Sequence, residues 1–169
     1  AAHMNRNRRA RLLFPALALA LLAGCRTGTV SSQSEWPVVP ACFVAGARTV
    51  PVVLELASTP EQRRVGLMGR SELPANHGML FRYPEERSPS QGFWMYRTRL
   101  PLDIAFLDRQ DHILRIRSMI PCLAGDSAGC PTYPAGVPYW SAVEMNAGFY
   151  QANQIEVGDR LRLGDDCHR

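Results

Sequence analysis

The feature that most limits the fold of this chain is the division of its apolar residues into short runs. Between Val50 and Leu163, these runs have the length of strands and are separated by Gly, Pro, Asn and Asp, which turns prefer. The predicted strands are 50–57, 78–83, 93–98, 102–108, 113–119, 140–147 and a last one ending near Leu163. The pattern predicts a mainly β (β-rich α+β) fold, a compact single-domain barrel or sandwich of about seven strands.

Two short helices are expected among these strands. Thr59, Pro60 and Gln62 form a capping arrangement that predicts the start of the first helix, and the glycines that follow limit it to a few turns. The second is a short helical turn within 147–157. Residues 120–139 are rich in Pro, Gly and Ala, which predicts a long loop over one mouth of the domain.

The N-terminal segment is typical of an export signal. Residues 1–3 precede Met4 and are interpreted as a remnant of expression. Arginines at 6, 8, 9 and 11 then precede an apolar run, 12–23, that is shorter than the ~20 residues a membrane-spanning helix needs. We therefore predict that 4–24 is a signal peptide that is removed.

The end of this segment, Leu-Ala-Gly-Cys, resembles the lipobox of bacterial lipoproteins. The resemblance implies that Cys25 carries the lipid and anchors the protein to a membrane, since each buried methylene adds about 0.8 kcal/mol. The alternative is a plain signal peptide with an incidental Cys. Residues 25–40 are then a flexible tether, and 41–167 form the domain. An exported, periplasm-facing lipoprotein is expected, and Arg26 after the anchor favours the outer membrane in a cell that has one.

Removal of the signal also changes the charge of the protein. Four of the 19 basic residues lie in the signal, so 15 remain against 15 acidic residues and the formal net charge falls to zero. A basic patch is the usual mark of a nucleic-acid-binding protein, and we predict no nucleic-acid partner. Lysine is absent throughout, which excludes Schiff-base catalysis by lysine.

Four cysteines follow the anchor, and an even number in an exported chain indicates disulfides. Four cysteines allow three pairings, of which we predict Cys122 with Cys130, inside one Pro-rich loop, and Cys42 with Cys167, joining the ends of the domain. The alternative is a metal site, but no Cys-x-x-Cys or Cys-x-x-His spacing occurs. We expect no metal and no cofactor.

Several phrases of the sequence resemble the motifs of one bacterial and archaeal family, domain-of-unknown-function family 192. These phrases are "ELASTPEQRRVGLMGR", "GMLFRY", "FWMYRTRLPLDIAFLD", and "AVEMNAG" followed by "VGDRLRL". The resemblance spans Val50 to Leu163 and implies a mostly β fold, often in an exported or lipid-anchored protein, but no particular activity. The chain departs from the family pattern at Arg97, where Asn is usual, and at Gln62, where Arg is common.

Alternation along the strands selects candidate site residues. Asp103 shares a strand face with Ala105, and Glu144 shares one with Ala142, so small neighbours leave space beside each acid. We predict a polar pocket with an aromatic wall, lined by Arg70, Trp94, Arg97, Thr98, Asp103 and Glu144. The alternative is that Arg70 forms a structural ion pair with a carboxylate.

The leading hypothesis is therefore a lipid-anchored envelope protein that binds a small polar ligand, of which a saccharide is one candidate. A second hypothesis is an envelope hydrolase in which Asp103 and Glu144 act as acid and base on a glycosidic bond. An enzyme is disfavoured because no nucleophile with its base can be named. A third is Cu(I) binding through the thioethers of Met68, Met79 and Met95, against which core packing is the simpler explanation.

Overall fold

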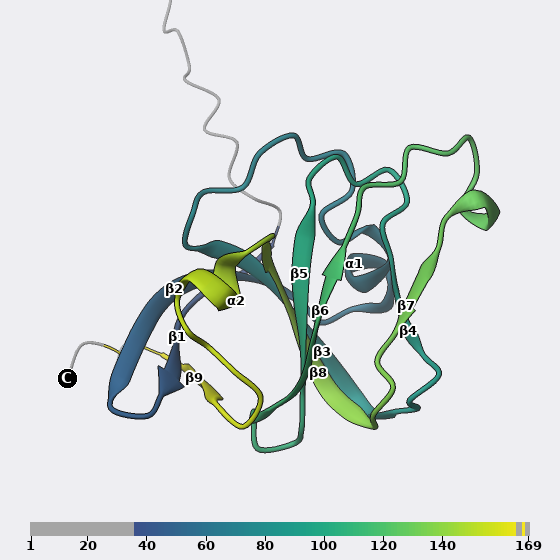
Figure 1. The fold of residues 1–169 in the computed structure, drawn as a ribbon. Coiled ribbons are helices and arrows are strands. Elements are labelled where there is room, and N and C mark those ends of the chain that lie inside the picture. The colour runs from purple at the N-terminus through teal and green to yellow at the C-terminus, as the bar shows by residue number, and fades with distance from the viewer. Residues whose placement is uncertain (1–35, 165–166, 168–169) are drawn as a thin grey trace, which may run out of the picture. The chain divides into compact units, whose positions relative to one another are not determined.

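The computed structural model describes residues 36–164 and Cys167. Within them the strands dominate, with two short α-helices and one turn of 3-10 helix (Figure 1). The elements are β1 (Val38–Ala45), β2 (Arg48–Ala57), α1 (Pro60–Val65), β3 (His77–Arg87), β4 (Gly92–Trp94), β5 (Leu102–Leu107), β6 (Ile113–Met119), η1 (Ser127–Gly129), β7 (Thr132–Pro134), β8 (Tyr139–Asn146), α2 (Phe149–Ala152) and β9 (Arg160–Leu163). The prediction of a mainly β fold with two short helices is confirmed.

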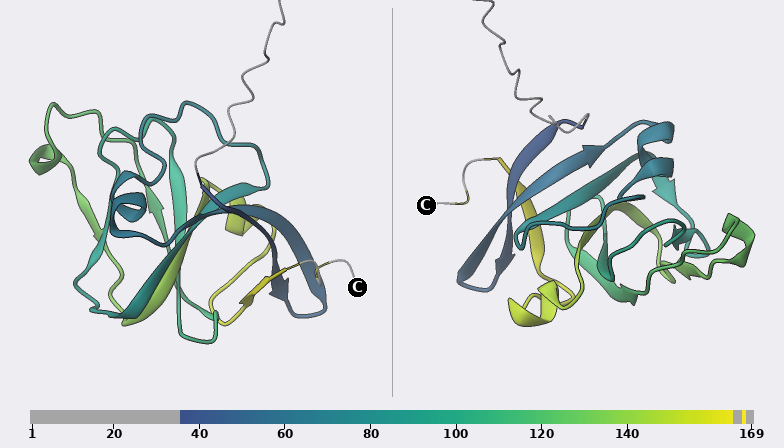
Figure 2. Two further views of the ribbon diagram at one scale, coloured as in Figure 1. Left: turned by 180° about the vertical axis from the view of Figure 1, so that it is seen from behind. Right: turned by 90° about the horizontal axis from the view of Figure 1, so that it is seen from above.

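Seven of the strands form one mixed sheet in the order β6-β5-β8-β3-β2-β1-β9, and β4 and β7 form a small antiparallel sheet. Among the paired strands of the described chain, only β2 and β3 run parallel. The large sheet curls strongly (Figure 2), and its two edges meet at a single bridge between His112 and Arg160. A few backbone hydrogen bonds lie beside this bridge, such as the one from the Ile113 N–H to the Asp159 carbonyl at 2.8 Å, but no continuous ladder joins the described edge strands. The sheet is therefore sandwich-like and does not close as a barrel.

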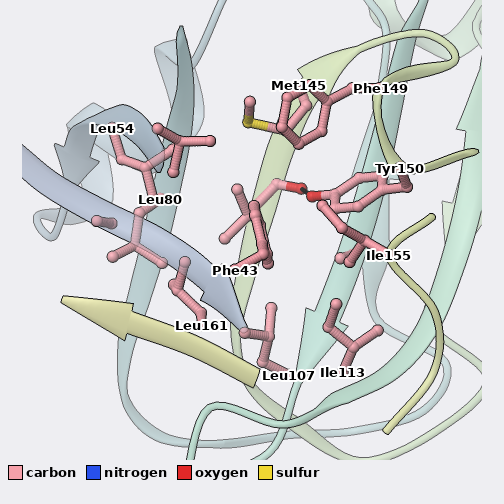
Figure 3. Packing of buried hydrophobic residues seen from close by; sticks show 14 residues of the cluster. Phe43, Leu54, Leu80, Leu107, Ile113, Met145, Phe149, Tyr150, Ile155 and Leu161 are labelled. Atoms are coloured by element: carbon pink, nitrogen blue, oxygen red, sulfur yellow. Dashed lines mark hydrogen bonds between the residues drawn. The ribbon is translucent and has the colours of Figure 1, made fainter. Parts of the chain in front are cut away.

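Each face of the large sheet carries its own hydrophobic cluster. On the concave face, Phe43 and Leu54 pack with other apolar side chains, including Tyr150 of α2, and the Tyr150 hydroxyl donates a 2.8 Å hydrogen bond to the Val143 carbonyl (Figure 3). On the opposite face lies the second cluster, in which Phe81 of β3 and Phe106 of β5 are joined by residues from outside the large sheet, such as Leu67 and Phe93. A strand places successive side chains on opposite faces, so β5 and β8 contribute to both clusters and are buried almost throughout.

Three features differ from the sequence predictions. The first strand begins at Val38, inside the segment predicted as tether, and Pro40 is tolerated there because β9 pairs with β1 only from Ala41 onward. The predicted strand 93–98 is cut to β4, because the chain turns after Trp94. The predicted loop 120–139 contains β7, which pairs with β4.

Both disulfides form as predicted, Cys42 with Cys167 and Cys122 with Cys130. The first joins β1 to the end of the chain, across 125 residues of sequence. The second closes the loop that precedes β7, across 8 residues.

The predicted signal peptide, Cys25 and most of the predicted tether lie outside the described residues, and these features stay predictions. In the described part of the chain, no helix combines the length and the apolar character needed to cross a membrane.

Candidate functional site

A cleft of about 490 Å³ opens on the face of the large sheet that carries the second cluster. One wall is α1 with the turn that follows it, residues 66–68, and the opposite wall is the small sheet of β4 and β7. Strand β3 contributes Phe81 and its more exposed end, and β8 contributes Glu144. Ligand pockets in proteins commonly have volumes of about 300 to 1,000 Å³, so this cleft has room for a small molecule.

Glu144 is the only carboxylate that the described sheet strands place at the inner end of the cleft. Its side chain is enclosed, with a relative exposure of 4% for the residue. Its cross-strand neighbours on the same face are Met79 in β3 and Ile104 in β5, both apolar. No described residue donates a hydrogen bond to its carboxyl or forms an ion pair with it.

This isolation determines the protonation state of Glu144. Burial alone raises the pKa of the carboxyl from 4.5 to about 8. Desolvation penalises the charged form of an acid and no nearby positive charge offsets the penalty. At neutral pH the group is therefore mostly a neutral carboxylic acid, which can donate one hydrogen bond and accept others.

Thr98 adds a second polar group at the cleft, amid aromatic walls. Thr98 is 4% exposed, and its hydroxyl makes no hydrogen bond to any described residue. Phe81 and Phe93, whose ring centroids are 4.9 Å apart in an edge-to-face arrangement, line the cleft beside it. Trp94 stands at the entrance with 41% of its surface exposed.

Helix α1 is fixed beside the cleft by its own sequence. The Thr59 hydroxyl accepts from the Gln62 backbone N–H while the Gln62 side chain accepts from the Thr59 N–H, which confirms the predicted capping box. The helix ends at Gly66, which has φ of 49°. A Cβ at this position would lie 3.3 Å from the Phe81 ring, so glycine lets the end of the helix lie against the cleft wall.

Arginines surround the outer part of the cleft. The guanidinium groups of Arg63 and Arg87 lie 4.8 and 4.9 Å from the centre of the Tyr83 ring. Arg63 also donates to the backbone carbonyls of Ser58 and Arg82. The nearest carboxylate to Arg87 is Glu85, at 4.0 Å, so Arg87 is only weakly neutralised.

The structure does not bring the six predicted site residues together. Glu144, Thr98 and Trp94 line the cleft, whereas Arg70, Arg97 and Asp103 do not. Arg70 forms a bidentate pair with the buried Glu55, through hydrogen bonds of 2.7 and 2.5 Å. The alternative reading of Arg70 as a structural ion pair is therefore confirmed.

Asp103 lies on the opposite face of the sheet from Glu144. In the register of β5 and β8, Asp103 is opposite Met145 and Ile104 is opposite Glu144. Its oxygens accept from the Ser118 hydroxyl and from the Gly148 backbone N–H, both at 2.7 Å. Asp103 thus fixes the turn that begins α2, and the two acids do not flank a common space as a glycosidase pair must.

The three methionines of the copper hypothesis also differ in their surroundings. Met79 and Met95 are completely buried in the second cluster, and only Met68 reaches the cleft. Among the described residues, no three of His, Cys, Asp and Glu lie close enough together to hold a metal ion.

The sequence and the fold are similar to those of known proteins. A sequence model described as DUF192, Uncharacterized ACR, matches residues 43–163. The chain belongs to this family. It is similar to the crystal structure of a "putative transcription regulator" from Sinorhizobium meliloti 1021, with 30% identity and a TM-score of 0.68 over 76% of this chain and 95% of that one. It is also similar to a protein of unknown function from Novosphingobium aromaticivorans DSM 12444, with 28% identity and a TM-score of 0.66 over 78% of this chain and 89% of that one. No curated protein matches the chain.

The motifs that resemble the DUF192 pattern meet at the cleft. The Gly-Leu-Met phrase supplies residues 66–68, Gly-Met-Leu-Phe ends in Phe81, Phe-Trp supplies residues 93–94, and Glu144 comes from the phrase before the last strand. The sequence analysis did not predict Phe81, Phe93 or the outer arginines as site residues. The pattern of one strand does not show which other elements pack against it in the fold. Their position within the family motifs is the signal that could have identified the two phenylalanines.

Proposed function

We propose that this DUF192 domain is a binding module for a small polar ligand, with a saccharide as the first class to test. The observation that carries the proposal is the Glu144 carboxyl, which lines a cleft of about 490 Å³ in a residue only 4% exposed and has no hydrogen-bond or ion-pair partner among the described residues. A neutral carboxylic acid can donate one hydrogen bond and accept others. A ligand in the cleft could accept a hydrogen bond from Glu144 and exchange one with Thr98.

The aromatic surroundings favour a ring-shaped ligand with hydroxyl groups. Trp94 offers an exposed aromatic face at the entrance, and the two phenylalanines offer apolar surface inside. Sugars combine an apolar ring face with hydroxyls that both donate and accept, which suits an aromatic wall next to a neutral acid and a threonine.

We further propose that the domain acts in the cell envelope, attached through lipid on Cys25. Support comes from the export-signal pattern and the Leu-Ala-Gly-Cys sequence, and both disulfides suit an oxidising compartment. The alternative of a hydrolase needs two acids at one site, but Asp103 lies on the opposite face of the sheet from Glu144. We therefore propose binding without turnover.

The test is a binding experiment with two variants that remove the unpartnered groups. Thr98→Val and Glu144→Leu each replace a buried polar group by an apolar one of similar size, so the fold should keep or gain stability while binding is lost. Thermal-shift and calorimetric titrations of the protein with sugars, amino acids and nucleotides identify the ligand class, since a ligand at 100 times its Kd adds about 2.7 kcal/mol. The control is Glu156→Gln, at an exposed site outside the cleft. Full affinity in both Thr98→Val and Glu144→Leu would refute the site.

A further inference from the structure

A second hollow, called here the groove, continues from the cleft around the end of α1. It has a volume of about 660 Å³ and shares three lining residues with the cleft, namely Arg64, Val65 and Met68. Its far side consists of Arg97, Arg99 and residues 123–125 of the loop closed by the Cys122–Cys130 disulfide. The cleft and the groove are therefore adjoining parts of one longer depression.

The charge along this depression is strongly one-sided. Five arginines line it, at positions 63, 64, 87, 97 and 99, against two acids, Glu85 and Glu144. Burial raises the pKa of Glu144 to about 8, so this acid is mostly uncharged at neutral pH. Arg64 is paired with Glu61. The remaining four arginines far outweigh Glu85, whose carboxylate is 77% exposed to water.

Two of the three arginines that line the groove, Arg97 and Arg99, are available to a ligand. Neither Arg97 nor Arg99 forms an ion pair with a described carboxylate, and both side chains belong to exposed residues. Arg97 lies 5.0 Å from the centre of the Tyr96 ring, which orients its guanidinium group without neutralising it. A guanidinium group can bind a carboxylate or a phosphate through two parallel hydrogen bonds.

Arg97 has a backbone conformation that an arginine rarely adopts. Its φ is 55°, in the left-handed region where Asn and Gly are favoured. Two backbone hydrogen bonds impose this conformation, from the Arg97 N–H to the Cys122 carbonyl at 2.8 Å and from the Gly69 N–H to the Arg97 carbonyl at 2.9 Å. The chain thus keeps an arginine in the groove at a position where its backbone disfavours it, and such strain often accompanies a functional role.

We propose that the cleft and the groove together bind an acidic saccharide, with its carboxylate or phosphate held by Arg97 and Arg99 and an uncharged sugar ring beside Glu144. The inference rests on the proposed function and adds to it the charge and the length of the ligand. The sugar ring lies in the cleft, and the ligand extends past Arg64, Val65 and Met68 to place its oxyanion in the groove.

The experiment compares ligands that differ only in charge. Tetragalacturonate and its methyl ester have the same length, and glucose 6-phosphate and glucose are the corresponding phosphate pair. Isothermal titration of the disulfide-bonded protein should give tighter binding of tetragalacturonate than of its ester, with an advantage of about tenfold at low salt that shrinks as salt is added. The affinity ratio of glucose 6-phosphate to glucose is compared with the affinity ratio of tetragalacturonate to its ester. If the phosphate pair gives the larger ratio, the oxyanion is a phosphate and the inference stands.

Two variants test the groove itself. Arg97→Asn places at this position a residue that suits the left-handed backbone, so its melting temperature should rise while its affinity for the charged probe falls about tenfold. Arg99→Ala should weaken the charged probe similarly and leave the neutral one unchanged. Arg109→Ala, at an exposed position outside both hollows, removes one arginine elsewhere and should change affinity less than twofold.

The outcomes separate the two proposals. Equal affinity for charged and neutral probes, with both lost in Glu144→Leu, would overturn the inference and leave the proposed function in place. No binding of any saccharide would overturn the inference, and no binding of any sugar, amino acid or nucleotide would overturn both. Tighter binding of a DNA duplex than of every saccharide, lost in Arg97→Asn, would overturn the inference in favour of a nucleic-acid partner.

Discussion

At the scale of single residues, Glu144 links stability to pH. Its pKa is about 8 in the folded protein against 4.5 for an unperturbed glutamate, so between these values the folded state binds more protons than the unfolded state. The free energy of unfolding should therefore fall as pH rises from 4.5 towards 8, by up to about 1.4 kcal/mol per pH unit, and level off above. Chemical denaturation of Glu144→Gln between pH 4.5 and pH 8 should show a smaller decrease of the free energy of unfolding with pH than the unmodified protein shows.

The control for this prediction is Glu156→Gln, which neutralises an exposed glutamate. It should retain the slope of the unmodified protein, because it leaves Glu144 and the lining of the cleft unchanged. The other charged groups of the cleft, Arg63, Arg64, Arg87 and Glu85, are the same in all three proteins. An identical slope in Glu144→Gln would show that the carboxyl is solvated or paired in solution.

At the scale of elements, the two disulfides should contribute unequally to stability and to binding. On the loop-entropy model, removal of Cys42–Cys167 should cost on the order of 5 kcal/mol and removal of Cys122–Cys130 about half as much. The shorter bridge, however, closes the loop whose residues 123–125 form the far side of the groove. Removing it should therefore weaken the binding of a charged ligand more than removing the longer one.

Paired serine variants measure both effects. Cys122→Ser with Cys130→Ser should lose affinity for tetragalacturonate while most of the stability remains in a urea titration. Cys42→Ser with Cys167→Ser should lose more stability, and at a temperature where it stays folded its affinity should be near that of the unmodified protein. The reverse order of the affinities would contradict a role for the loop in the groove.

The positions of the strands could be predicted from the sequence more reliably than the pairing of strands, which decides which residues share a face of the sheet. Alternation correctly placed Asp103 and Glu144 each among small residues of its own strand. It could not predict that β5 and β8 would pair with Asp103 opposite Met145, which sends the two acids to opposite faces. The partner of Arg70 was unpredictable for the same reason, since Glu55 reaches it only through the fold of β2 and the turn after α1. Local signals such as the capping box at Thr59 depend on neighbours in sequence and were predicted correctly.

At the scale of the whole molecule, one curled sheet serves two purposes. Its concave face is filled by apolar side chains, and the buried Asp103 on this face is hydrogen-bonded to Ser118 and Gly148. Its other face carries the cleft, which is lined by α1, the turn after it and the small sheet. The cluster on the concave face can therefore stabilise the domain while the cleft keeps a polar group that the fold itself does not need.

The proposed attachment to a membrane predicts how the whole protein behaves in a cell. With lipid on Cys25 the protein should sediment with membranes, resist extraction by salt or carbonate, and incorporate labelled fatty acid, because several acyl chains on one residue give durable binding. Cys25→Ala should move it to the soluble fraction after export and abolish the label. Cys25 lies outside the described domain, so the thermal unfolding and ligand affinity of the released protein should match those of the anchored form. A variant that stays in the membrane fraction and keeps an uncleaved signal would instead indicate retention by the apolar segment 12–23, and a labelled Cys25→Ala would contradict lipidation at this residue.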